Sequence, residues 1–94
     1  MSNAGGYTEP RKADEQIQEL CNQVKDQVEA KTGKDYIQFT AILYRTQVVA
    51  GINYLIKVDV GDSYLHLWLY QDLSDHVVVM KVQEHKKDDP LVPF

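Results

Sequence analysis

Cysteine and histidine are the side chains of this 94-residue chain that could carry nucleophilic or metal-assisted chemistry. Cys21 lies on what reads as the apolar stripe of a helix, where burial raises the pKa of a thiol and limits access to it. His66, His76 and His85 do not form an HExxH motif or a comparable ligand spacing. The carboxylates are scattered, and the glycines form no phosphate-binding loop. The sequence therefore predicts a binding module that is not an enzyme and has no metal site and no cofactor.

A short apolar motif is the stronger candidate for function. Residues 47–51 read QVVAG and lie between two segments whose alternating pattern predicts β-strands. Apolar side chains on the tip of a hairpin are difficult to cover with the core, so they usually mark a contact surface. The small side chains of Val48, Val49 and Ala50 would let the backbone enter a narrow groove, and Gly51 permits an otherwise strained backbone angle. The alternative is that the valines pack against the body of the protein or form an ordinary wide loop.

The charge pattern argues against two classes of partner. The formal net charge is −4, and the longest basic run, Lys86-Lys87, is followed at once by Asp88-Asp89. Nucleic acids and anionic membrane surfaces both favour a concentrated patch of positive charge. We therefore expect neither nucleic acid nor membrane as a partner.

The single cysteine and the first ten residues bear on the cellular compartment. One cysteine cannot form an internal disulfide, and residues 1–10 lack the apolar segment of a secretory signal. No apolar run approaches the length that spans a bilayer. The sequence predicts a reducing, cytoplasmic location.

A flexible arm and one long helix are expected at the start of the chain. Residues 1–13 are polar and contain glycine and proline, which predicts a flexible arm. Asp14 is a good helix N-cap and Gly33 a good C-cap. Between them, apolar side chains recur at spacings of three or four, at Ile17, Leu20, Cys21, Val24 and Val28. The spacing predicts an amphipathic helix over residues 14–32.

From Tyr36 onward the apolar period changes to two, as in β-strands. Ile37, Phe39 and Ala41 share one phase, and a slip of that phase near Ala41–Leu43 predicts a β-bulge. Further strands are expected over residues 52–60, 65–70 and 77–84, followed by an extended tail over 88–94. In the segment 65–70, the leucines are expected to face inward, and the side chains expected to face outward are His66, Trp68 and Tyr70.

These elements together predict the fold class. One long N-terminal helix followed by strands with short connections predicts an α+β fold, in which the helix packs on a four- to five-stranded antiparallel sheet. The whole chain, residues 1–94, is expected to form one domain.

The sequence resembles a known family, the stefins or type 1 cystatins. The resemblance rests on QVVAG between the first two strands and runs from about Gly5 to Phe94. The other matching stretches are Gly5-Gly6, Asn53-Tyr54, Ile56-Lys57-Val58, His66-Leu67, Lys87-Asp88-Asp89, Leu91 and Phe94.

The resemblance implies a reversible, competitive, noncovalent inhibitor of papain-like cysteine proteases, the cathepsins among them. It also implies that three segments form a wedge that fills the protease cleft: the N-terminal arm, the QVVAG hairpin and a second hairpin loop. The implied contact residues are Ala4, Gly5, Gln47, Val48, Val49, Ala50, Gly51, Leu73 and Ser74.

The second loop departs from the family pattern, because Ser74 stands where stefins typically have proline and the loop is shorter. This departure leaves open a second function, a non-inhibitory adaptor or binding scaffold with the same fold. The resemblance further implies a monomer, with a domain-swapped dimer as an alternative state.

Overall fold

The computed structural model describes residues 6–94 and contains the helix where the sequence predicts it. Helix α1 spans Glu15–Thr32. The Asp14 carboxylate accepts a hydrogen bond from the Ile17 amide at 2.9 Å and caps its first turn. Gly33 ends the helix with a left-handed backbone (φ 72°), and its amide donates to the Glu29 carbonyl at 2.8 Å. Both predicted caps are confirmed.

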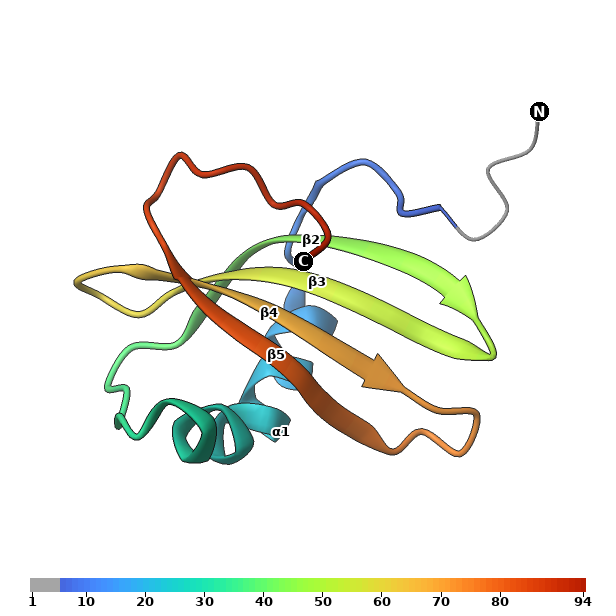
Figure 1. Ribbon diagram of the computed structural model, residues 1–94, viewed down its shortest axis with the longest axis horizontal. Coiled ribbons are helices and arrows are strands. Elements are labelled where there is room, and N and C mark those ends of the chain that lie inside the picture. The colour runs from blue at the N-terminus through green and yellow to red at the C-terminus, as the bar shows by residue number, and fades with distance from the viewer. Residues whose placement is uncertain (1–5) are drawn as a thin grey trace.

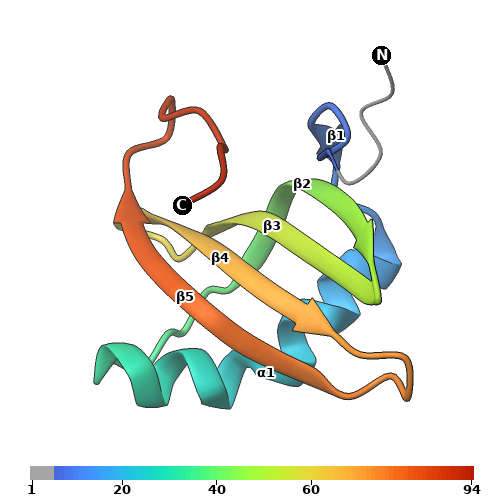
Figure 2. The ribbon, with the colours of Figure 1, turned by 45° about the vertical axis from the view of Figure 1, so that its right-hand side comes forward.

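Five antiparallel strands form one sheet in sequence order (Figure 1). They are β1 (Arg11–Lys12), β2 (Thr40–Val49), β3 (Gly51–Asp59), β4 (Tyr64–Gln71) and β5 (Val77–His85). Helix α1 crosses one face of this sheet, which Figure 2 shows from a second direction. The predicted α+β class is confirmed.

The core lies between α1 and the face of the sheet that it covers, here called the inner face. The helix contributes Ile17, Cys21, Val24 and Val28, all buried. The sheet contributes buried aliphatic side chains at alternate positions, as a pleated strand requires: Ile56, Val58, Leu65, Leu67, Leu69, Val77 and Val79.

Two glutamines of α1 bind strand backbone in the same way. The side-chain amide of Gln18 donates to the Phe39 carbonyl at 2.9 Å and accepts from the Ala41 amide at 2.8 Å. Gln27 repeats this pattern with the Val77 carbonyl (3.2 Å) and the Val79 amide (3.1 Å). Each amide therefore satisfies a carbonyl and an N–H two residues apart, as a neighbouring strand would.

The first long strand begins later than the sequence pattern predicts. Strand β2 starts at Thr40, and Ile37 is fully exposed. The preceding loop instead follows the end of α1, because the Tyr36 amide donates to the Glu29 carboxylate at 2.8 Å and the Tyr36 ring packs on Phe39. The predicted bulge is confirmed, since the register of β2 against β3 shifts between Ala41 and Leu43.

The flexible arm predicted over residues 1–13 needs correction from Thr8 onward. The Thr8 amide donates to the Thr46 carbonyl at 2.8 Å, β1 pairs with β2, and the Ala13 amide donates to the Ile42 carbonyl at 2.9 Å. Arg45 also donates to the Thr8 carbonyl at 2.8 Å. The segment is polar because it covers a strand edge, where backbone hydrogen bonds and not apolar burial hold it.

The face of the sheet opposite the helix, here called the outer face, is also partly covered. His66 was expected to face outward, and its side chain does lie away from the core, but it is only 1% exposed. The C-terminal segment, residues 86–94, turns back over this face (Figure 2). Leu91 from this segment and Leu55 from β3 are both buried. A side chain on the outer face of the sheet can therefore be buried, because the C-terminal segment covers part of this face.

The glutamine contacts give a first prediction. We expect Gln18→Ala and Gln27→Ala each to lower the free energy of unfolding by about 1–3 kcal/mol, because each removes two hydrogen bonds to strand backbone and leaves those backbone groups without this partner. Urea denaturation followed by circular dichroism measures this. Gln23→Ala, on the exposed face of the same helix, is the matched control. Equal stability of all three variants would contradict the role of the amides.

Candidate functional site

The strand register places two connections at the same end of the sheet. Val49 pairs with Gly51 across the β2–β3 turn, and Ile52 pairs with Gln71 at the end of β4. Gln71 in turn pairs with Val77 at the start of β5, so the β4–β5 loop lies beside the β2–β3 turn (Figure 1, right). The antiparallel sheet thus places the predicted contact residues 47–51 at the same end as Leu73 and Ser74.

The N-terminal segment leads toward this same end. Its hydrogen bond from Thr8 to Thr46 places the chain beside the last third of β2, antiparallel to it. Tyr7 and Gly6, the described residues before Thr8, therefore lie on the side of the hairpin tip. The predicted contact residues Ala4 and Gly5 lie outside the described residues.

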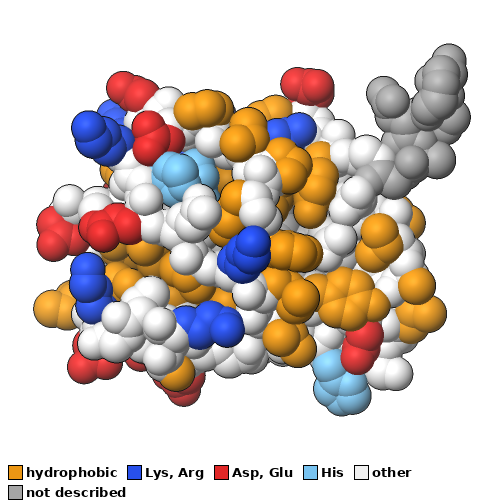
Figure 3. Space-filling view, viewed as in Figure 1, with side chains coloured by type: hydrophobic (Ala, Val, Ile, Leu, Met, Phe, Trp, Pro, Cys, Tyr) orange, Lys and Arg blue, Asp and Glu red, His pale blue; other side chains and the backbone are white. Residues whose placement is uncertain are grey.

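The tip of the β2–β3 hairpin is apolar and exposed. Val48 is 74% exposed and Val49 is 41% exposed, and Ala50 is exposed as well. Hydrophobic side chains gather toward this end of the molecule, and charged ones toward the other (Figure 3). The prediction that the valines point away from the body is confirmed, and the alternative that they pack against it is wrong.

Gly51 permits the tip to lie close to β4. Its backbone has φ 110°, a region that favours glycine. A Cβ atom at this position would lie 2.3 Å from the Gln71 carbonyl oxygen, far inside van der Waals contact. The backbone of the turn is therefore fixed against the end of β4, where the second loop begins.

A chain of hydrogen bonds across three strands supports the tip. Asn53 donates to the Gln47 side-chain oxygen at 2.8 Å and accepts from the Trp68 indole N–H at 3.0 Å. The Tyr70 hydroxyl donates to the Ala50 carbonyl, at the turn itself. Asn53, Trp68 and Tyr70 were not among the predicted site residues. Their outward phase in the strands was visible in the sequence, but their partners depend on the register of three strands.

The β4–β5 loop is braced internally without a proline. The Asp72 carboxylate accepts hydrogen bonds from the amides of Ser74 (2.8 Å) and His76 (3.0 Å). The backbone hydrogen bond from His76 is the main reason that the pKa of Asp72 is lowered, and the bond from Ser74 adds to it. Leu73 is 80% exposed at the tip of this loop. The loop therefore presents one apolar side chain on a fixed backbone.

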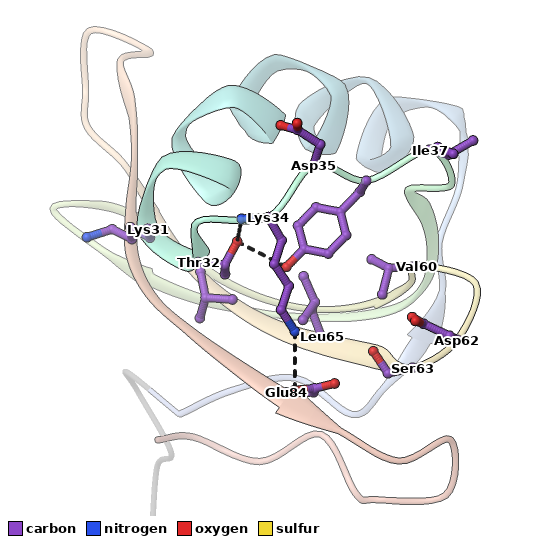
Figure 4. Close-up of a pocket in the computed structure, with 12 residues that line it drawn as sticks. Lys31, Thr32, Lys34, Asp35, Ile37, Val60, Asp62, Ser63, Leu65 and Glu84 are labelled. Carbon is purple, nitrogen blue, oxygen red and sulfur yellow. Dashed lines mark hydrogen bonds and ion pairs between the residues drawn. The ribbon is translucent and has the colours of Figure 1, made fainter.

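A cavity lies at the opposite end of the molecule (Figure 4). It has a volume of about 550 Å³ and is bounded by the end of α1, the β3–β4 turn and β5. Its charges are mixed, and Lys34 and Glu84 approach to 3.9 Å across it. The cavity is separate from the apolar tip.

No group of three or more histidine, cysteine or acidic side chains in residues 6–94 could hold a metal ion.

Comparison with known proteins connects this geometry to a family. The Cystatin domain model matches residues 5–88 of the chain. Leukocyte cysteine proteinase inhibitor 1 of Sus scrofa is 51% identical over 96 residues, which cover 97% of this chain and 93% of that protein. Cystatin-A of Bos taurus is 46% identical, covering 96% of this chain and 97% of its own. Cystatin-B of Oplegnathus fasciatus is 43% identical, with 96% and 95% covered.

The chain segment from residue 6 to 94 includes no helix that is both long and apolar enough to cross a membrane.

The backbone of Gly51 gives the second prediction. We expect Gly51→Ala to lower the free energy of unfolding by more than about 2 kcal/mol, because the left-handed backbone alone costs a non-glycine residue about 1–2 kcal/mol and the contact with Gln71 adds to it. Gly33→Ala is the matched control, since Gly33 also has a positive φ (72°) but nothing lies within 4 Å of where its Cβ atom would be. Thermal and urea denaturation measure both. Equal losses in the two variants would show that the contact with β4 is unimportant.

Proposed function

The chain belongs to the cystatin family, and from this we propose that it is a reversible, competitive, noncovalent inhibitor of papain-like cysteine proteases, including cathepsins. The observation that carries the proposal is the exposed Val48-Val49-Ala50 tip, fixed at the same end of the sheet as the β4–β5 loop. One of the relatives is named a leukocyte cysteine proteinase inhibitor, which supports the same function.

In this proposal the hairpin tip enters the primed side of the protease cleft. Val48, Val49 and Ala50 bury apolar surface there, and Gln47 and Gly51 maintain the shape of the tip. The hydrogen bonds of Gln47 to Asn53 and of Tyr70 to Ala50 hold the tip in place before binding. Little conformational entropy is then lost when the tip binds.

The N-terminal residues supply a second contact in the proposal. Ala4 and Gly5 occupy the unprimed subsites in an extended form, and Gly5 lets the chain turn away before a peptide bond reaches the protease thiolate. The side chain of Ala4 offers little apolar area, and a missing branched side chain forgoes about 1–2 kcal/mol of burial. Most of the affinity therefore comes from the hairpin tip, in line with the usual concentration of binding energy in a few central residues.

Leu73 and Ser74 of the β4–β5 loop form the third contact. Proline would stiffen this loop by restricting its backbone, whereas here the Asp72 carboxylate holds the amides of Ser74 and His76. The exposed Leu73 side chain supplies the apolar contact. The short loop reaches less far than a longer one, so we assign it a smaller share of the binding energy than the hairpin tip.

The proposed inhibitor carries out no reaction of its own. Cys21 is completely buried in the core, and burial raises the pKa of its thiol to about 12, so it supplies no thiolate nucleophile. A single free cysteine also fits a reducing compartment, and we place the protein in the cytoplasm.

A second function is favoured by the short β4–β5 loop. If the loop fails to reach the protease, the same fold could act as an adaptor that binds another protein without inhibiting a protease. A titration of active-site-quantified papain separates the two functions. Absence of inhibition at micromolar protein would favour the adaptor.

The hairpin tip gives the third prediction. Val48→Asp should weaken inhibition of papain at least about tenfold, a loss of about 1.4 kcal/mol, because it brings a charge into an apolar contact. The inhibition constant is measured by steady-state kinetics on a variant whose circular dichroism spectrum is unchanged.

Ile37→Asp is the matched control, since Ile37 is fully exposed at the other end of the molecule. It should leave the inhibition constant unchanged, and Leu73→Asp should weaken inhibition less than Val48→Asp does. Full inhibition by a folded Val48→Asp variant would refute the role of the tip.

The oligomeric state gives the fourth prediction. We infer that the monomer is the inhibitory form. Val48 and Val49 are β-branched and suit an extended backbone, so the β2–β3 turn could straighten and join β2 and β3 into one long strand in a domain-swapped dimer. Such a dimer has no hairpin tip. Size-exclusion chromatography with a papain assay on each fraction should show inhibition in the monomer fraction alone, and a fully inhibitory swapped dimer would contradict the inference.

A further inference from the structure

The C-terminal segment, residues 86–94, is held on the outer face of the sheet by three polar contacts. Arg45 donates to the Leu91 carbonyl at 2.6 Å, and Lys57 donates to the Lys87 carbonyl at 2.8 Å. The His85 ring and the Asp89 carboxylate approach to 2.8 Å. Leu91 belongs to this segment, and its side chain is buried, so it adds apolar contact with the sheet.

His66 lies under this segment without a hydrogen bond for one ring nitrogen. Its side chain is 1% exposed, and its Nε2 atom has no partner among the described residues. The His85 ring stacks on it, with 3.8 Å between ring centroids and an interplanar angle of 19°. A buried polar atom without a partner is rare in proteins, and burial of a charged group without a partner costs far more than burial of the neutral one. The closed arrangement therefore holds His66 in its neutral form.

The charged groups that face His66 also favour its neutral form. Lys57 is paired with His66 across β3 and β4 and is itself buried. The ring nitrogens of His85 lie 2.8 Å from the Asp89 carboxylate and 3.0 Å from the Gln83 side-chain oxygen, and these contacts fix the His85 ring against His66. Asp89 is the carboxylate that faces this group of positive charges. A proton on His66 would therefore lie beside the Lys57 ammonium and against the stacked His85 ring, with one carboxylate nearby.

We propose that residues 86–94 form a pH-sensitive clasp on the outer face, closed while His66 is neutral and released when His66 binds a proton. Release exposes Leu91 and Leu55 and separates the two histidine rings. Arg45 and Lys57 then lose their carbonyl partners in the segment. The inner core is not part of this change, because α1 and its contacts lie on the other face of the sheet.

The direction of the pH dependence follows from the two states of His66. Burial first, and then the charges of His85 and Lys57, lower the pKa of His66 from its ordinary value of 6.5 to about 4 in the closed state. Between these two values the open state binds more protons than the closed one, so acid favours opening. The closed clasp is fully stable above about pH 6.5 and loses stability as the pH falls toward 4.

Nuclear magnetic resonance of the full chain tests the clasp. The heteronuclear NOE of amides in residues 86–94 reports their mobility, and the ring protons of His66 report its titration, between about pH 7.5 and 3.5. We expect the NOE of the Leu91 and Val92 amides to fall by more than about half as His66 titrates. The amides of Val24 and Val58 should keep their dispersed shifts, because the inner core stays folded.

His66→Phe keeps an aromatic ring under the clasp and cannot bind a proton, so its segment should stay ordered at low pH. His76→Phe is the matched control, since His76 is exposed on the β4–β5 loop, and it should open like the unmodified protein. A segment that stays ordered after His66 has titrated, or that loosens equally in His66→Phe, would overturn the proposal. If His66→Phe does not fold, the unmodified protein decides: release and His66 titration must share a midpoint, and separate midpoints overturn it.

Discussion

The apolar stripe of α1 packs against the inner face of the sheet, and the positions of the other elements depend on this contact. A chain of 94 residues has room for one such core. Apolar packing is not directional, so it fixes the helix on the sheet only loosely. The amides of Gln18 and Gln27 add direction, because each binds strand backbone at a defined pair of residues. Packing and hydrogen bonding together set the position of the helix along the strands.

The antiparallel order of the strands determines which turns lie together at one end of the sheet. Because β2, β3, β4 and β5 are joined by short turns in sequence order, the first and third of these turns must lie at the same end. The tips of the turns at this end lie outside the core, so their exposed side chains are available to bind a partner. The apolar residues there are held by local contacts, such as those of Asn53 and Asp72, and not by the core. Stability and binding thus depend largely on different residues of the same strands, and Gly51 serves both.

The sequence was sufficient where the signal was local. The caps at Asp14 and Gly33, the bulge after Ala41 and the exposed tip at Val48 each depend on residues close together in the chain. The strand pairing of the segment after Thr8 could not be predicted. This segment is held by backbone hydrogen bonds, which leave no apolar pattern in the sequence. The burial of His66 likewise depends on a tail that follows it by more than twenty residues. Ile37 fitted the strand period and still lies in a loop, because Tyr36 is bound to the helix end.

The position of Gln27 has a consequence for the behaviour of the protein in concentrated solution. Strand β5 forms one border of the sheet, and an uncovered border strand offers free backbone groups to which another chain can add. Gln27 already occupies the carbonyl of Val77 and the amide of Val79 on this border. At the other border, β1 is only two residues long. Intermolecular strand addition, the first step toward fibrils, is therefore obstructed at the start of β5 by a side chain that also serves the folded monomer, and the short β1 limits it at the other border.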